Sequence, residues 1–134
     1  MTPQTHDAVT ATVARVSLPL TSGTPSLRER PLMDNDQATG VAAVFKVLSS
    51  DTRLRLLHVI VRDGEVRVTD LAAQVGMSAQ NVSNHLQRLV DWRILSTRRD
   101  GTSIYYRIVD PCIPQMIEFA VCMHQTPGGG CPQA

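Results

Sequence analysis

The feature that most limits the possible folds is a change of hydrophobic period after Val90. Before it, apolar residues recur at helical spacing. After it, residues 94–99 and 102–109 form two short runs rich in β-forming residues, joined by Asp100–Gly101. An Asp-Gly pair between two such runs is a strong hairpin signal. The sequence therefore predicts helices followed by a two-stranded hairpin.

Four helices are predicted ahead of the hairpin and one behind it. Ser78 is a typical N-cap and Gly76 a typical helix-ending residue. Pro111 and Pro114 fit only near the first turn of a helix, so they mark where the last one begins. The expected helices cover residues 36–48, 51–63, 68–75, 79–90 and 112–125. The expected fold class is mainly α with a small β-hairpin, namely a winged helix-turn-helix of five helices and a two-stranded wing.

The two ends of the chain differ from this domain in composition. Residues 1–33 mix Thr, Ser, Pro and isolated Val without a sustained period, which predicts a flexible N-terminal tail. Residues 126–134 contain three consecutive glycines and predict a flexible C-terminal tail. One domain is therefore expected over residues 34–125.

The fourth helix carries a polar and almost uncharged face opposite its apolar one. Gln and Asn amides can bind adenine through two hydrogen bonds, and a helix of this kind fits the major groove. A capping serine and the free amides of the first turn suit a phosphate. The arginines and the tip glycine of the hairpin suit the DNA backbone or the minor groove. The predicted DNA contacts are Ser78, Gln80, Asn81, Ser83, Asn84, Gln87, Arg98, Arg99 and Gly101, with Arg107 beside them.

Charge and composition favour contact with phosphate and argue against a membrane protein or an enzyme. The net charge is only +1, but the stretch from Asp51 to Arg107 holds nine Arg against six acidic residues, and Arg suits bidentate contact with phosphate. No stretch reaches the roughly 18 apolar residues of a membrane helix, and no signal peptide is recognised, so we expect a cytoplasmic protein without a membrane partner. No phosphate loop, paired catalytic carboxylates or nucleophile beside a base is found, so we expect no enzyme, and no cofactor for DNA binding.

Three segments carry a family resemblance: VLSSDTRLRLLHVI, VTDLAAQVGMSAQNVSNHLQRL and RRDGTSIYYRIVDP. They resemble the ArsR/SmtB family of small winged-helix repressors, over Val41 to Gln125. The resemblance implies a homodimer that is paired through its first and last helices and sits on double-stranded operator DNA. It also implies release from DNA when a metal, metalloid or thiol-reactive signal binds. The implied interface residues are Val41, Val44, Phe45, Met116, Ile117 and Ala120.

The resemblance also indicates where a sensor site would lie. One family pattern has two cysteines in the third helix, where this chain has Arg67 and Thr69. A second has cysteines within and just after the recognition helix, where this chain also has none. A third places ligands on the last helix, which here starts Asp110–Pro111–Cys112, with a thiol in place of an imidazole. Cys122 lies near the distal ligand position of that pattern, about one residue away from it.

All three cysteines, Cys112, Cys122 and Cys131, lie in the last quarter of the chain. In the cytosol such thiols are more often free, redox-active or metal-bound than structural disulfides. The spacing of Cys112 and Cys122 corresponds to about 15 Å along a helix, whereas a disulfide needs Cα atoms within roughly 7 Å. In an intact helix these two can therefore share a ligand only across a dimer. Alternatively, Cys131 can reach Cys122 on its Gly-rich tether.

Sulfur-rich ligation selects thiophilic ions, so the expected inducer is a soft metal or metalloid of the Hg, As, Cd or Pb class. Asp110 and His124 are candidate accessory ligands. Cys112 lies in a first helical turn, where free amides and the helix dipole lower a thiol pKa, so we expect it to be partly thiolate near neutral pH. Two alternatives stay open: a repressor that senses thiol redox state or persulfide, and a winged-helix repressor with inert cysteines.

Overall fold

The computed structural model describes residues 25–129, and the chain divides into two units, Met1–Asn35 and Asp36–Ala134. The described part of the first unit contains a short 3-10 helix, η1 (Leu27–Glu29). The backbone N–H of Ser26 donates to Glu29 Oε2 at 2.9 Å, so a side chain satisfies a backbone donor at the start of this turn. The sequence predicted only a tail here, because a single turn leaves no periodic apolar pattern.

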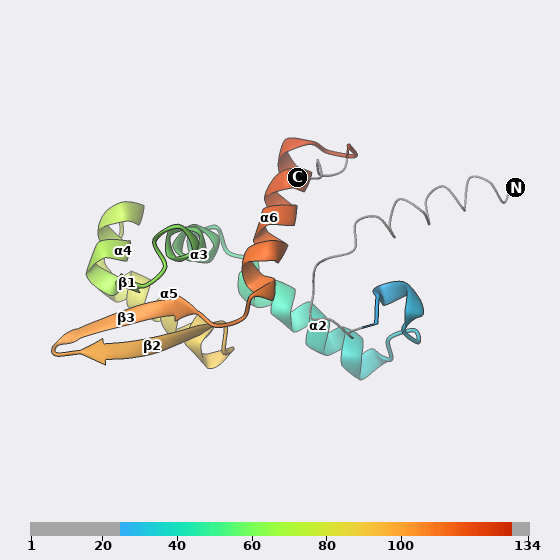
Figure 1. Cartoon of the computed structure of the whole chain (residues 1–134), viewed down its shortest axis with the longest axis horizontal. Helices are drawn as coiled ribbons and strands as arrows, with labels where there is room; N and C mark the ends of the chain where they lie inside the picture. The colour runs from blue at the N-terminus through green and yellow to red at the C-terminus, as the bar shows by residue number, and fades with distance from the viewer. Residues whose placement is uncertain (1–24, 130–134) are drawn as a thin grey trace, which may run out of the picture. The chain divides into compact units, whose positions relative to one another are not determined.

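The second unit is a winged helix-turn-helix, as predicted (Figure 1). Its helices are α2 (Asn35–Leu48), α3 (Asp51–Asp63), α4 (Val68–Val75), α5 (Ala79–Asp91) and α6 (Cys112–Gln125). Its strands are β1 (Val66–Arg67), β2 (Leu95–Asp100) and β3 (Ser103–Ile108). Across residues 25–129, the α-helices agree with the predicted ones to within one residue at each end.

The start of α5 and the end of α4 follow the predicted caps. The side-chain oxygen of Ser78 accepts a hydrogen bond from the backbone N–H of Asn81 at 3.2 Å, at the start of α5. Ser50 caps α3 in the same way, through the N–H of Arg53 at 3.3 Å. α4 ends at Gly76, whose φ of 71° lies in the left-handed region that glycine adopts at little cost. These caps define the short turn that sets α5 against α4.

One aliphatic core holds this unit together. Its fully buried side chains are Leu56, Leu57, Ile60, Leu71, Val82, Leu86 and Leu89. They come from α3, α4 and α5, and burial of each such side chain is worth about 1.5–3 kcal/mol. α2 and α6 contribute much less, since only Val47, Leu48 and Ile113 are buried in those two helices. Within residues 25–129, no helix is long and apolar enough to cross a membrane.

The wing contains a strand that the sequence did not predict. β1 pairs antiparallel with β3, with Val66 opposite Tyr106 and Arg67 opposite Tyr105, so the strand order is β1-β3-β2. A strand of two residues is too short to show a period, and for this reason only a two-stranded wing was expected. The β2–β3 turn contains Gly101 at a φ of 64°, in agreement with the predicted hairpin.

Candidate nucleic-acid interface and thiol site

α5 separates polar from apolar side chains cleanly. Its core side consists of buried Val82, Leu86 and Leu89. The opposite side carries the predicted DNA contacts, which are all exposed except for half-buried Ser83: Ser78, Gln80, Asn81, Ser83, Asn84 and Gln87.

Hydrogen bonds between successive turns order this polar side. Gln80 Nε2 donates to Asn84 Oδ1 at 3.1 Å, and Gln87 Nε2 donates to Asp91 Oδ1 at 2.9 Å. Such pairs at i,i+4 hold side chains in place on a helix surface. A helix with an ordered, exposed amide face is suited to hydrogen bonding with base edges in a major groove.

The β2–β3 hairpin extends away from the helices (Figure 1). Arg99 lies near its tip, is exposed, and makes no ion pair with any residue of the described range 25–129. Together with the nearby exposed Gly101, it is placed to approach a phosphate backbone. Arg107 is exposed as well, farther along β3.

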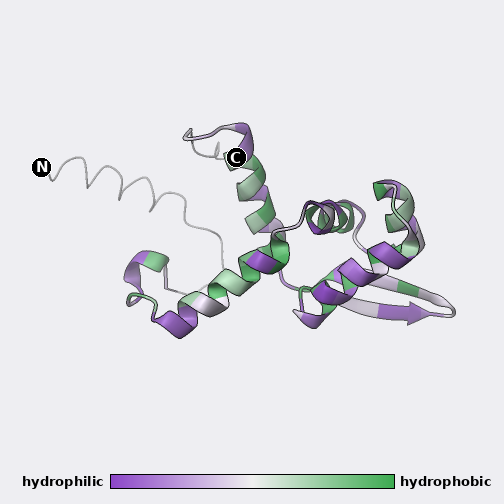
Figure 2. Cartoon of the chain, turned by 180° about the vertical axis from the view of Figure 1, so that it is seen from behind, coloured by the Kyte–Doolittle hydropathy of each residue, from purple (hydrophilic) through white to green (hydrophobic). Residues whose placement is uncertain are grey.

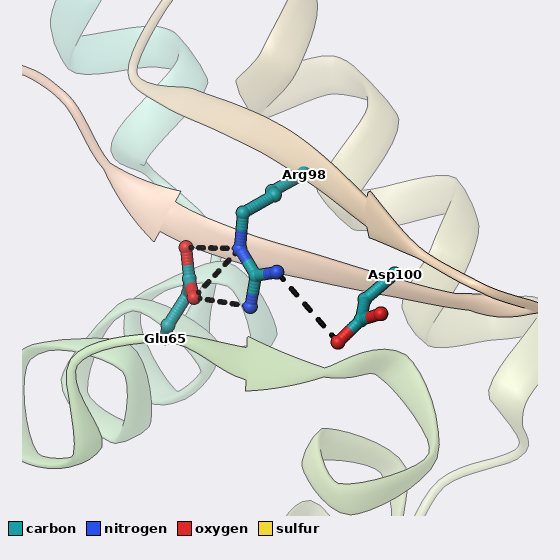
Figure 3. Close-up of polar contacts among 3 residues, drawn as sticks. All are labelled: Glu65, Arg98 and Asp100. Atoms are coloured by element: carbon teal, nitrogen blue, oxygen red, sulfur yellow. Dashed lines mark hydrogen bonds and ion pairs between the residues drawn. The ribbon is translucent and has the colours of Figure 1, made fainter.

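Arg98 has different surroundings from Arg99. Its Nη2 donates to Glu65 Oε1 at 2.8 Å, and its Nε lies 3.1 and 3.2 Å from the two Glu65 carboxylate oxygens (Figure 3). The guanidinium also lies over the Tyr105 ring, 4.6 Å from its centroid. The structure therefore pairs Arg98 with a residue that the sequence interpretation did not single out. No local pattern could have identified Glu65, because it lies 33 positions away.

The ion pair keeps both partners charged. The hydrogen bond from Arg98 lowers the pKa of Glu65, and the same bond raises the pKa of Arg98. Asp100 adds a second carboxylate, with Oδ2 3.9 Å from Arg98 Nη1. Arg98 thus lies between two carboxylates, and its positive charge is compensated within the protein.

Cys112 is the first residue of α6 and is half-buried. Burial, and then the hydrogen bond and negative charge of Asp110, raise the pKa of its thiol. The prediction of a lowered pKa was wrong. The helix start does offer free amides, but Asp110 Oδ1 takes the N–H of Cys112 at 2.9 Å and brings a negative charge beside the thiol.

Cys122 lies on the same unbroken helix as Cys112. A rise of 1.5 Å per residue puts about 15 Å between these two positions, so one chain cannot bring them to a common ligand. Cys122 is half-buried and disulfide-bonded in this structure, and Cys131 lies outside the described residues. Asp110 and His124 are both exposed. Among residues 25–129, no three His, Cys, Asp or Glu side chains gather as a metal site would require.

α2 and α6 leave apolar side chains uncovered. Val41 and Phe45 of α2 are 41% and 58% exposed, and Val121 and Met123 of α6 are 48% and 69% exposed. Hydrophobic residues occupy much of α6 (Figure 2). Of the other predicted interface residues, Ala120 is exposed and three are half-buried: Val44, Met116 and Ile117. Large exposed apolar patches are typical of sites of protein association, so these two helices stay the candidate interface.

Comparison with known proteins places the chain among regulators. Residues 50–103 match the model of the MarR family. This segment covers α3 to α5, β2 and the first residue of β3, but neither α2 nor α6. The HTH-type transcriptional regulator KmtR of Mycobacterium tuberculosis is 41% identical over 103 residues, which cover 77% of this chain and 78% of that protein. A homologue of the cadmium resistance regulatory protein CadC, from Staphylococcus aureus, is 38% identical over 63% of this chain and 69% of its own length.

Solved structures agree with these relatives. The crystal structure of the AntR antimony-specific transcriptional repressor is 53% identical and matches with a TM-score of 0.68, covering 78% of this chain and 95% of that one. The homodimeric winged helix-turn-helix DNA-binding domain Mb0332 of Mycobacterium bovis, a possible ArsR-family regulator, is 27% identical with a TM-score of 0.61, over 78% of this chain and 99% of its own. From its fold and these relatives, the chain belongs to the ArsR/SmtB family of metal-responsive, DNA-binding winged helix-turn-helix transcriptional regulators, which are not enzymes.

Proposed function

We propose that this protein is a homodimeric repressor that binds operator DNA through α5 and the wing and is released by a thiophilic metalloid or metal. The observation that carries the proposal is the placement of Cys112 and Cys122 near opposite ends of α6, a helix with uncovered apolar side chains. The 53% identity to a repressor described as antimony-specific supports a trivalent metalloid, Sb(III) or As(III), as the inducer.

In this proposal α5 enters the major groove with its exposed amides toward the bases. Ser78 and the first-turn N–H groups bind a phosphate, since a helix N-terminus favours an anion. Arg99 and Gly101 of the wing approach the neighbouring backbone. Two copies joined through α2 and α6 present two such helices to successive turns of the groove.

The sensor site forms between subunits. Two α6 helices that run antiparallel across the dimer bring Cys112 of one chain toward Cys122 of the partner subunit. Cys131 is a third candidate thiolate, and Asp110 and His124 are accessory ligands. Because the pKa of Cys112 is raised, binding of a soft ion must displace a proton there, so induction strengthens as pH rises.

DNA binding requires one arrangement of the two subunits. Binding of the ion to the thiols favours a different arrangement and so weakens DNA binding. A coupling free energy of about 1–3 kcal/mol per site is sufficient for regulation, and by linkage DNA weakens inducer binding by the same factor. A second candidate is a thiol redox switch. The disulfide at Cys122 supports it, because a cysteine that forms a disulfide can change state without any metal.

The test is a fluorescence anisotropy titration on DNA selected by the protein from a random library. Sb(III), As(III), Cd(II), Hg(II) and peroxide are added separately to the reduced DNA-bound protein. Release by a metalloid or metal, but not by peroxide, supports the ion sensor, whereas release by peroxide alone supports the redox switch. Release by an ion that persists in a Cys112→Ser/Cys122→Ser/Cys131→Ser variant contradicts a thiol site altogether.

Mixed dimers test the cross-subunit arrangement. Cys112→Ser and Cys122→Ser homodimers each lack one ligand in both sites and do not respond. A heterodimer of the two variants contains one intact site and one empty one, so it regains a response. If Cys122 instead pairs with Cys131 in its own chain, the Cys112→Ser homodimer keeps its full response and the cross-subunit site is excluded.

A further inference from the structure

We propose that Glu65 is a positioning residue that sets the orientation of the wing for DNA by holding Arg98, and that Arg98 itself does not contact phosphate. This inference rests on the proposed role of the wing in DNA binding. It gives a function to a residue in the α3–α4 connection, outside the predicted DNA contacts.

The Glu65–Arg98 ion pair links the two edges of the sheet. Glu65 directly precedes β1, whereas Arg98 lies on β2, at the opposite edge of the order β1-β3-β2. Tyr105 of β3 is the register partner of both Arg98 and Arg67, so these three residues form a row across the three strands. The Arg98 guanidinium lies over the Tyr105 ring, 4.6 Å from its centroid. It also reaches Glu65, to which Nη2 donates at 2.8 Å (Figure 3).

This link lies in the last row of the sheet that includes all three strands, and beyond it toward the tip only β2 and β3 pair. At the base of the hairpin, Leu95 and Tyr106 are buried in the core. Beyond them, residues 97–102 are all exposed, whereas half-buried Ile104 of β3 still packs against the core. A two-stranded hairpin is marginally stable on its own, so contacts along its face decide how its outer half is oriented. The three Arg98–Glu65 hydrogen bonds are therefore placed to fix the outer half against the α3–α4 connection.

The charges argue against a direct phosphate contact by Arg98. Its guanidinium faces Glu65 at 2.8 Å and Asp100 at 3.9 Å, so a phosphate would have to compete with two carboxylates. Arg99 follows it in the strand, points to the other face of the sheet, and has no such neighbour among residues 25–129. The two adjacent arginines thus have different roles. Arg98 orients the wing, and Arg99 binds the DNA backbone.

Exchanging the charges of Glu65 and Arg98 distinguishes a positioning role of Arg98 from a direct phosphate contact. Arg98→Glu alone adds a third carboxylate beside Glu65 and Asp100, and it weakens DNA binding whether Arg98 positions the wing or contacts phosphate. In Glu65→Arg/Arg98→Glu the pair is restored with reversed polarity and unchanged net charge. We expect this double variant to regain most of the wild-type affinity. If affinity stays as low as in Arg98→Glu, then Arg98 acts through its own positive charge and the proposal is overturned.

Neutral variants give a second, independent readout. Glu65→Gln and Arg98→Gln are each expected to lower affinity about two- to fivefold, as for an exposed ion pair, and the double variant no further. The dependence of log K on log salt keeps its slope in both, whereas Arg99→Gln reduces the slope by about 0.9, the value for one phosphate contact. Additive losses, or a reduced slope in Arg98→Gln, contradict the positioning role.

A matched control comes from the same face of the sheet. Arg67 and Asp70 form an exposed ion pair at 3.2 Å within one turn of chain, so it does not join the hairpin to the rest of the domain. The Arg67→Gln/Asp70→Asn variant is expected to bind DNA like the wild type. Failure of the wild type to bind any selected DNA refutes the proposed function, whereas binding without recovery in the charge exchange refutes only the role of Glu65.

Discussion

Asp110 accepts a hydrogen bond from the backbone N–H of Cys112, with 2.9 Å between Oδ1 and N. The same carboxylate contributes, after burial, to the raised pKa of the Cys112 thiol. Asp110 therefore satisfies the first backbone N–H of α6 and, together with burial, favours the thiol form of Cys112. In the proposed sensor, an ion that binds Cys112 has to displace the thiol proton, so Asp110 is expected to weaken its binding.

Asp110→Asn is expected to lower the pKa of Cys112, because removing a negative charge stabilises the thiolate. The change is partial, since burial is the larger cause and remains. The measurement is the rate of iodoacetamide alkylation against pH in a Cys122→Ser/Cys131→Ser background, with Glu118→Gln on α6 as control. A wild-type midpoint below that of an ordinary thiol, or no shift in Asp110→Asn, contradicts this account.

Ser78 is expected to have separable roles in stability and in DNA binding. Ser78→Ala removes the cap on Asn81 and lowers the free energy of unfolding by about 1 kcal/mol. Ser78→Asp keeps a capping oxygen and so keeps the stability, but its charge repels a phosphate and lowers affinity. Urea unfolding followed by the single tryptophan, Trp92, and anisotropy with DNA measure the two effects. Equal DNA affinity of the wild type and Ser78→Asp would show that no phosphate binds there.

Arg53 is expected to hold three helices in place. Its Nε donates to the Val47 carbonyl of α2 at 2.6 Å, and its Nη1 lies 3.4 Å from His85 Nδ1 on α5. Arg53→Met removes these contacts, and hydrogen bonds to a charged group are worth about 1.5–3 kcal/mol. We expect a lower unfolding midpoint in urea and weaker DNA binding, while the exposed Arg62→Met serves as control. If Arg53→Met lowers stability but leaves DNA affinity unchanged, Arg53 contributes to folding and not to DNA binding.

Phe45 is expected to lie in the dimer interface. Phe45→Glu places a carboxylate in the apolar contact and should yield monomers, because a charge buried without a partner is costly. Sedimentation equilibrium measures the mass, and circular dichroism checks that the helices remain. Val61→Glu on α3 is the matched control, since Val61 is 46% exposed and lies outside α2 and α6. A dimeric Phe45→Glu variant would exclude α2 from the interface.

Local chemistry made the helices and the hairpin predictable. Ser78 and Gly76 define α5 and α4 through bonds and dihedral angles that span only a few residues. The Asp100–Gly101 pair acts over an equally short range. The polar face of α5 could be read in the same way, because helical period alone places Gln80 and Asn84 on one side.

The sequence by itself determined the order of the five α-helices and the hairpin, the caps of α4 and α5, and the spacing of Cys112 and Cys122 along one helix. Only the tertiary structure decided what surrounds each charged or reactive group. It joined Glu65 to Arg98 across the sheet and added β1. It also raised the pKa of Cys112 chiefly through burial. The reason is physical: capping and period act between near neighbours, whereas ion pairing and desolvation depend on groups that packing brings together from distant parts of the chain.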